Sequence, residues 1–508
     1  MSFAGDLWSR FRWGRTTEPA RVVIIGAGFG GLGMAIQLKR AGHHNFLVVE
    51  KANDIGGVWR DNTYPGAACD VPSHLYCYSF EQDFGWSQRY ATQPEIHAYL
   101  EQCTEKYGLD EHLKLGTEIA SADFDERTGQ WRLLTATGEL IDADVLVPAC
   151  GQLGRPATPD IPGLNSFTGT IMHSSRWQPD RDLSGRRVAV IGTGSSALQI
   201  VPAIAARTDR LTVFQRSASH IVPRLEASYS TARRQTARAP RTLSRLGWWL
   251  LYESMALGIT RWPPAAAGAV RGSRALLAAQ VEDPELRARL TPDTEIGCKR
   301  VGISSTYYPA LVRPNVEVAT DRIVAVTEHG IRTADAAEHV VDTIILATGF
   351  EATDFLAPMR IRGRDGQELS RVWRHGARAY LGITVPSFPN MFLIYGPNTN
   401  IGAGSIIYML ESQIRYIRRA IAKLTTAPGH SFDVRPRVED RFHREMQRRM
   451  RSTAWVTCRS WYRHANGQVT NNWPGQTFEY RWRTSRFVLA EYRVTAHNRE
   501  QRPAGTNQ

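Results

Sequence analysis

Two glycine-rich segments with the same spacing carry the most specific chemistry in the chain. In the first, Gly26, Gly28 and Gly31 follow the apolar run 22–25, and Glu50 stands twenty-four residues after Gly26. In a strand–turn–helix–strand unit, such glycines let the backbone approach a pyrophosphate that rests on the helix N-terminus. An acid at the end of the second strand accepts hydrogen bonds from a ribose 2′-hydroxyl. The first segment therefore predicts a site for FAD or NAD.

The second segment repeats this spacing with the opposite charge at its end. Its loop residues, which follow the apolar run 188–191, are Gly192, Gly194, Ser195 and Ala197. Arg216 stands twenty-four residues after Gly192, where the first unit has its acid. Because a guanidinium at that point pairs with a 2′-phosphate, the segment predicts an NADPH site. FAD and NADPH together would form an electron path, whereas NAD and NADPH would make a transhydrogenase.

The composition excludes several classes of protein. The 508 residues are 42% hydrophobic and 22% charged, which is typical of a globular protein with two or three domains. The net charge of +13 favours anionic ligands, but the arginines are spread out and zinc-finger spacing is absent, so nucleic acid is not an expected partner. The six cysteines include no Cys-x-x-Cys pair, which predicts buried free thiols and no metal site.

The sequence shows neither a secretion signal nor a convincing membrane span. The first twenty residues mix tryptophan and arginine without an apolar core, so a cytoplasmic location is expected. The longest apolar stretch, 246–262, is interrupted by Glu253, two glycines and Thr260. We expect a helical lid or core helix there, with peripheral membrane contact as the minor alternative.

The order of these elements predicts an α/β fold of two Rossmann-like dinucleotide-binding domains, the NADPH domain being inserted into the FAD domain. Residues 1–155 form the first part of the FAD domain, and a run of prolines marks the boundary that follows. Residues 156–335 form the NADPH domain, with a helical insertion at about 226–295. Residues 336–508 complete the FAD domain and include a C-terminal segment.

The segment between the two glycine loops carries a further pattern. Phe167, Gly169, His173 and Trp177 fit Phe-x-Gly-x-x-x-His-x-x-x-Trp, which closely resembles the signature of type I Baeyer–Villiger monooxygenases. That family usually has Pro or Asp directly after the tryptophan, whereas this chain has Gln178 first. Related flavin-containing N- and S-monooxygenases usually lack the tryptophan.

The resemblance covers nearly the whole chain. Gly57 and Trp59 lie in a stretch that looks like the family's flavin-side loop. Asp70 and Arg300 occupy the positions of its active-site aspartate and arginine. Further matching segments are 64–67, 214–217 and 347–350.

The resemblance implies an NADPH- and O₂-dependent reaction. NADPH would reduce FAD, and the reduced flavin would take up O₂ as a C4a-peroxyflavin that attacks a ketone, which rearranges to an ester or lactone. The permanent charge of Arg300 would stabilise the anions that form, and Asp70 would hold the guanidinium in place.

Other residues are also expected at the cofactors. Lys299 and Arg216 would grip the 2′-phosphate of NADPH, with a further hydrogen bond from Ser217. His173 would position NADP between the domains, and an ordinary structural histidine is the alternative. Tyr76 would lie at the flavin, with simple packing as the alternative. Asn398 would also lie there, with a structural turn as the alternative.

Three other functions stay open on the sequence alone. An N- or S-oxygenating flavin monooxygenase would use the same cofactors on a soft nucleophile. A flavin reductase or NADPH oxidase would release peroxide, although the lack of a Cys-x-x-Cys pair argues against a disulfide reductase. A non-catalytic nucleotide-binding protein would take up no FAD.

Overall fold

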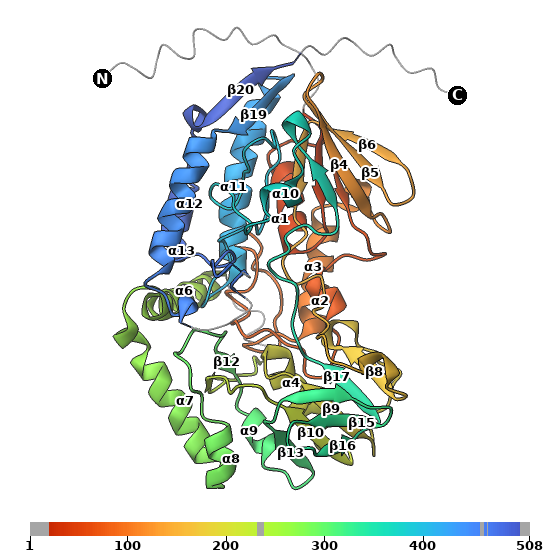
Figure 1. The fold of residues 1–508 in the computed structure, drawn as a ribbon. Helices are drawn as coiled ribbons and strands as arrows, with labels where there is room; N and C mark the ends of the chain where they lie inside the picture. Colours follow the sequence, from red (N-terminus) through yellow and green to blue (C-terminus); the bar gives the residue numbers. More distant parts are fainter. Residues whose placement is uncertain (1–19, 231–237, 458–461, 465, 498–508) are drawn as a thin grey trace.

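The computed structural model describes residues 20–230, 238–457, 462–464 and 466–497 (Figure 1). Its first nucleotide-binding unit has a parallel sheet in the order β3–β2–β1–β7. The strands are β1 (Val22–Ile25), β2 (Phe46–Val49), β3 (Leu113–Lys114) and β7 (Val145–Pro148). β1 and β7 are buried along their whole length, as strands covered on both faces must be. α1 (Phe29–Arg40) crosses from β1 to β2, which places the first glycine loop at the carboxyl end of β1.

A second sheet packs beside this unit. Its antiparallel strands are β4 (Ile119–Asp125), β5 (Gln130–Thr135) and β6 (Leu140–Ala143), and β18 (Arg360–Arg362) runs parallel to β4. The indole of Trp131 is buried and donates a hydrogen bond to the carbonyl oxygen of Pro389 at 2.8 Å. Residues after 350 therefore return to the first unit.

The other nucleotide-binding unit has a parallel five-stranded sheet in the order β13–β10–β9–β17–β8. The strands are β8 (Thr170–His173), β9 (Arg187–Ile191), β10 (Arg210–Phe214), β13 (Val316–Ala319) and β17 (Thr343–Leu346). α4 (Ser195–Ile204) crosses from β9 to β10 and repeats the arrangement of the first unit. A small antiparallel sheet flanks it, made of β14 (Ile323–Val326), β15 (Gly330–Thr333) and β16 (Glu338–Val340).

β17 corrects the expected end of the NADPH domain. It pairs with β8 and β9 in the second sheet, so this unit continues to residue 346 at least, and the boundary placed after residue 335 is too early. A short buried apolar strand has the same sequence pattern in either sheet, because its membership is decided by its pairing partners.

Between the units lies a helical region, as expected for about 226–295. It contains α6 (Arg238–Thr260), α7 (Ala267–Gln280) and α8 (Pro284–Arg289). The apolar stretch that begins at residue 246 is mostly the second half of α6. Within the described parts of the chain, no helix combines the length and the hydropathy needed to cross a bilayer.

The C-terminal part covers the first unit. α11 (Ile406–Thr425) packs against α1, and α12 (Pro436–Met450) follows β19 (His430–Val434), which pairs with β20 (Tyr492–Ala496). Figure 1 shows α11, α12 and the sheet β4–β5–β6 in the upper half and the second unit in the lower half. The remaining described α-helices and strands are α2 (Val58–Asp61), α3 (Gln93–Lys106), α9 (Tyr307–Leu311), α10 (Leu369–Val372), α13 (Thr477–Arg483), β11 (Ile221–Val222) and β12 (Gly302–Ile303).

Candidate active site at the junction of the two units

Arg300 and Asp70 form a two-bonded ion pair at the junction of the two units. Nε of Arg300 donates to Oδ2 of Asp70 and Nη2 donates to Oδ1, both at 2.9 Å. Asp70 lies in the loop after α2, whereas Arg300 lies just before β12. The two parallel bonds fix the plane of the guanidinium as well as its position. The structure therefore brings together the two residues that the resemblance assigned to catalysis, across 230 positions of the chain.

The pair keeps the guanidinium charged and still accessible. The charge of Asp70 raises the pKa of Arg300, and this effect outweighs the opposing cost of desolvation. The Arg300 side chain is 37% exposed, and its contacts with Asp70 use two of its five N–H groups. Burial raises the pKa of the neighbouring Tyr462 to about 12, and it also raises the pKa of Tyr395, so both phenols are neutral near pH 7. The hydroxyl of Tyr252 donates to the carbonyl oxygen of Asp70 at 3.2 Å.

The first glycine loop has the geometry that its sequence predicts. Gly26 has a φ of +106°, and a Cβ on Gly31 would lie 1.8 Å from the carbonyl oxygen of Gly26, so neither position accepts a side chain. Glu50 is buried, and its carboxylate accepts the backbone N–H of Ala27 at 2.9 Å and that of Ala52 at 3.0 Å. Glu50 is therefore fixed beside the loop, where a ribose hydroxyl is expected.

Residues of the flavin-side loop close over this site. A Cβ on Gly57 would lie 3.3 Å from Cα of Gly28, so the two backbone segments run close together. The indole N–H of Trp59 donates to the hydroxyl of Tyr76 at 3.1 Å, and the two rings meet edge to face. These contacts bring four of the predicted cofactor residues into one cluster.

Asn398 has contacts that fit its structural alternative, a turn. It is buried with a φ of +55°, and its side-chain amide donates to the carbonyl oxygens of Val469 and Asn472, both at 3.0 Å. Its backbone N–H donates to the carbonyl oxygen of Thr470 at 2.7 Å. Its donors therefore hold the 469–472 segment in place, and only its acceptor atoms are left for another role.

The second glycine loop also has room for a ligand. Gly192 has a φ of +119°, and a Cβ on Gly194 would meet nothing within 4 Å. α4 begins at Ser195, and Ala197 is fully buried against the sheet. Open space at the second glycine is what close approach of a pyrophosphate requires.

Three predicted phosphate-binding residues gather at the end of β10. Arg216 is exposed directly after this strand, and the ammonium group of Lys299 donates to the hydroxyl of Ser217. Burial lowers the pKa of Lys299, and the positive charge of Arg216 lowers it further. The two cations thus lie within electrostatic reach of each other and would both be stabilised by a bound dianion.

His173 has a structural environment. It is buried at the end of β8, and its Nε2 lies 3.1 Å from the carbonyl oxygen of Gly349. A carbonyl requires the proton on Nε2, so Nδ1 accepts from the backbone N–H of Ser175 at 3.1 Å. Burial lowers the pKa of His173. Both ring nitrogens are therefore used between β8 and the 347–350 segment, which supports the structural alternative.

The helix starts fit bound dinucleotides. Gly28 and Gly194 cap α1 and α4 without any side-chain hydrogen bond, and neither helix has an acidic residue in its first turn. The first N–H groups of each helix are thus left to a ligand, and the partial positive charge of each helix start favours a phosphate. With Glu50 beside one loop and Arg216 beside the other, the residues fit FAD at the first site and NADPH at the second.

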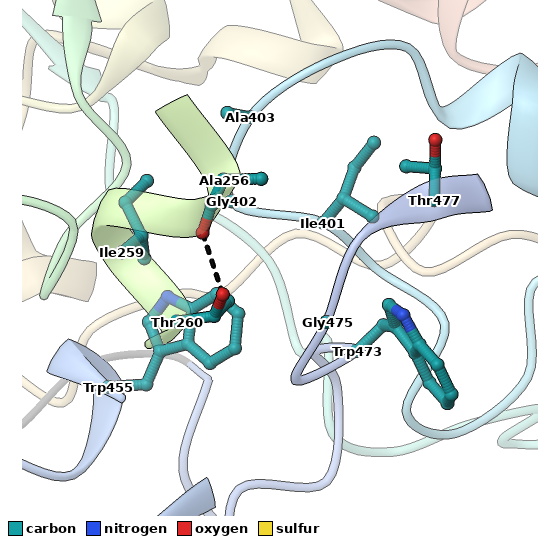
Figure 2. Close-up of a pocket in the computed structure, with 10 residues that line it drawn as sticks. All are labelled: Ala256, Ile259, Thr260, Ile401, Gly402, Ala403, Trp455, Trp473, Gly475 and Thr477. Atoms are coloured by element: carbon teal, nitrogen blue, oxygen red, sulfur yellow. Dashed lines mark hydrogen bonds between the residues drawn. The ribbon is translucent and has the colours of Figure 1, made fainter. Parts of the chain in front are cut away.

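A small cavity of about 10 Å³ lies between α6 and later segments of the chain (Figure 2). α6 contributes Ala256, Ile259 and Thr260, and the hydroxyl of Thr260 donates to the carbonyl oxygen of Ala256 at 2.8 Å. The other walls are 401–403, Trp455, Trp473, Gly475 and Thr477. Ile259 lies against Gly297, three residues before Arg300. No periodicity connects these walls, because those outside α6 lie about 140 to 220 residues further along the chain.

Two further observations concern metal and thiol chemistry. Asp54, His97 and Glu101 have ligand atoms close together, but the imidazole bridges the two acids, with Nε2 at 3.2 Å from Asp54 and Nδ1 at 3.4 Å from Glu101. Cys298 is disulfide-bonded, so the expectation of free thiols is wrong at that position. Cys458 lies outside the described residues.

Replacing Gly194 by alanine should separate ligand binding from folding. The φ of −78° suits alanine and the new Cβ would meet no protein atom, so we expect unchanged thermal stability and unchanged FAD content. The methyl group would occupy space needed by the pyrophosphate and should weaken NADPH binding by about tenfold or more. The matched control is Gly268→Ala in α7, where an added Cβ would also meet nothing within 4 Å. Unchanged NADPH affinity in Gly194→Ala would contradict the assignment of this loop.

Comparisons with known proteins agree with this geometry. Residues 23–238 match the family model described as pyridine nucleotide-disulphide oxidoreductase. The chain is 44% identical over 483 residues to a Baeyer–Villiger monooxygenase of Streptomyces coelicolor, which covers 94% of this chain and 93% of that one. It is 43% identical over 481 residues to a Baeyer–Villiger monooxygenase of Pseudomonas aeruginosa, with coverages of 94% and 91%.

Solved structures show the same likeness. The closed crystal structure of cyclohexanone monooxygenase superposes with a TM-score of 0.84 at 29% identity, covering 95% of this chain and 100% of that one. Oxidized steroid monooxygenase bound to NADP superposes with a TM-score of 0.82 at 33% identity, with coverages of 92% and 97%.

Proposed function

Since the chain belongs to the Baeyer–Villiger monooxygenases and is an FAD- and NADPH-dependent enzyme, we propose that it uses the Arg300–Asp70 pair to insert one oxygen atom beside a ketone carbonyl. The balanced reaction consumes a ketone, O₂, NADPH and one proton and gives an ester or lactone, water and NADP⁺. Bound FAD, once reduced, supplies the activation of O₂. The position of Arg300 between the two units is the observation that carries the proposal.

Arg300 would stabilise the negative charge that develops on the substrate's carbonyl oxygen. When a ketone is attacked at its carbonyl carbon, charge develops on the carbonyl oxygen, and a fixed cation nearby lowers the barrier. The two-bonded contact with Asp70 holds the guanidinium in place, so it does not have to reorient during the reaction. The exposed part of the side chain leaves donors free for the substrate oxygen.

The two glycine loops divide the cofactors by charge. Glu50 accepts hydrogen bonds and would repel a 2′-phosphate, which suits FAD at the first loop. Arg216, Ser217 and Lys299 would bind the 2′-phosphate of NADPH at the second loop. We assign the units around β1 and β9 to FAD and NADPH accordingly.

The surroundings of the pair are aromatic, and an apolar substrate bound there would displace water from the exposed part of Arg300. Tyr462 is buried near Arg300 with Trp455 beside it, and Tyr395 is partly buried there. Loss of water strengthens the interaction between the guanidinium and an anionic oxygen. These features support a hydrophobic ketone as the substrate.

Product analysis tests the proposal. The purified yellow holoenzyme would receive NADPH, ¹⁸O₂ and separate panels of ketones and sulfides, with mass spectrometry of the products. We expect esters or lactones that carry one labelled oxygen atom. Sulfoxides or N-oxides with every ketone untouched would instead identify an N- or S-oxygenating enzyme. Peroxide formation equal to NADPH use with every substrate would identify an oxidase.

A further inference from the structure

α6 turns its arginines toward the protein. Arg241 and Arg245 are each only 9% exposed. Nη1 of Arg241 donates to the carbonyl oxygen of Gln82 and to Asp83, both at 3.0 Å, and Nη1 of Arg245 donates to the carbonyl oxygen of Cys77 at 2.9 Å. These contacts fasten α6 to the loop that follows Asp70. The inner side of the same helix also contributes to the cavity in Figure 2.

The opposite side of α6 is apolar and open to solvent. Leu243, Leu246, Leu250, Leu251 and Met255 are between 37% and 69% exposed. Their spacing of three, four, one and four residues places them along one side of a helix. From residue 240 to residue 255, no exposed position is charged. A surface helix normally has the reverse arrangement, with charges outward and leucines inward.

α13, which begins beside α6, adds two exposed aromatic side chains. The indole N–H of Trp249 in α6 donates to the hydroxyl of Thr477 at 3.1 Å, and Glu253 accepts the backbone N–H of Thr477 at 3.0 Å. α13 therefore begins against α6, and Figure 1 shows the two helices as neighbours. On α13, Phe478 is 54% exposed and Trp482 is 75% exposed. We call the five α6 side chains named above, together with Phe478 and Trp482, the outer apolar face.

Arginines gather beside α13. The guanidinium of Arg481 lies 5.0 Å from the ring centre of Tyr408 in α11, and Arg419 donates to the carbonyl oxygen of Ser485 just after α13. Burial lowers the pKa of Arg415, and the charges of Arg481 and Arg419 lower it further, so the three cations lie within electrostatic reach of one another. This end of the outer apolar face is therefore positively charged.

We propose that the outer apolar face docks on the surface of an anionic lipid bilayer. The leucines and Met255 would enter the boundary of the acyl chains, Trp482 would lie at the headgroup level, and the arginines would meet lipid phosphates. α6 would lie in the plane of the membrane, in keeping with the absence of a spanning helix in the described residues. A two-fold contact with a second copy would bury the leucines, but it would leave the arginines without an anionic partner, because the exposed positions of the α6 face between residues 240 and 255 carry no charge.

Vesicle flotation of the holoenzyme tests this proposal. The vesicles would be phosphatidylcholine alone or phosphatidylcholine with a quarter phosphatidylglycerol. We expect the protein to float with the anionic vesicles, and the double variant L250E/W482E should reduce the partition coefficient by about tenfold or more. Arg481→Gln should reduce it by about fivefold at low salt. The matched control is Leu140→Glu. Leu140 is 61% exposed on β6, in the sheet β4–β5–β6 and away from α6 and α13, so this variant should float like the wild type.

The outcomes are distinguishable without knowing the reaction. FAD content and thermal stability in the absence of vesicles verify that the variants fold. Failure of the wild-type protein to float with either vesicle would overturn the proposal. Equal flotation of wild type and L250E/W482E would also overturn it, because the outer apolar face would then be irrelevant to binding. A dimer in sedimentation that L250E/W482E dissociates, without vesicle binding, would assign the face to a second copy.

Discussion

Replacing Arg300 by alanine is expected to lower the turnover number for ester formation by about 100-fold or more, an effect of the size seen when an oxyanion donor is removed. The guanidinium is the fixed cation at the junction of the two units, and its charge is maintained by Asp70. The glycine loops and Glu50 are untouched by the change, so FAD content should stay at the wild-type level. The measurement is ester formed per second at saturating ketone and NADPH.

Two companion variants separate the charge from its geometry. Arg300→Lys keeps a positive charge but loses the planar two-bonded contact, so we expect an activity between those of alanine and arginine. The double variant D70A/R300A removes the carboxylate that R300A leaves unpaired. It should be as inactive as R300A, and recovery of activity in the double variant would attribute the loss to the stranded carboxylate instead.

Arg216→Ala is expected to weaken NADPH binding by about tenfold to a hundredfold, because a charge-assisted contact to phosphate contributes about 1.5–3 kcal/mol. NADH has no 2′-phosphate, so its binding should change little. Arg216 is exposed at the end of β10, near Ser217 and Lys299, and its removal leaves the sheet intact. Dissociation constants of both nucleotides, measured by quenching of protein fluorescence, give the comparison.

The matched control is Arg210→Ala. Arg210 lies at the other end of the same strand, where it pairs with Glu317 at 2.7 Å on the protein surface. Its loss should leave both nucleotides unaffected. Equal weakening of NADPH and NADH in Arg216→Ala would mean that the arginine shapes the loop rather than recognises the phosphate.

The sequence predicted the local units well because their signals are local. Within each unit, the glycine loop, the helix that follows it and the charged residue, Glu50 or Arg216, lie within about 25 residues of one another. Backbone geometry imposes the glycines directly, as the 1.8 Å approach at Gly31 shows. Pattern and structure therefore agree wherever a strand, a turn and a helix are consecutive.

Contacts between residues far apart in the chain could not be predicted from local sequence patterns. The pairing of Asp70 with Arg300 came from the family resemblance alone, because no periodicity links residues 230 positions apart. The membership of β17 in the second sheet depends on its neighbours, β8 and β9, and not on its own residues. The hydrogen bond at Nε2 of His173 likewise depends on a carbonyl 176 residues away, whereas the one at Nδ1 is local.

In α6, the side chains that are buried differ from those that hydropathy alone would bury. Its sequence mixes leucines and arginines, and general hydropathy would bury the leucines. The arginines are buried instead because backbone carbonyls and Asp83 in the loop after Asp70 accept their hydrogen bonds. Only the three-dimensional arrangement of that loop reveals which side of the helix faces the protein.

The ratio of ester formed to NADPH consumed is the most direct test of the central claim that Arg300, held by Asp70, supports oxygen insertion. We expect a ratio near one for the wild-type enzyme with a good ketone substrate. For Arg300→Ala with bound FAD, we expect a ratio close to zero, with the remaining NADPH consumption appearing as hydrogen peroxide. An Arg300→Ala enzyme that keeps the wild-type ratio and rate would contradict the account.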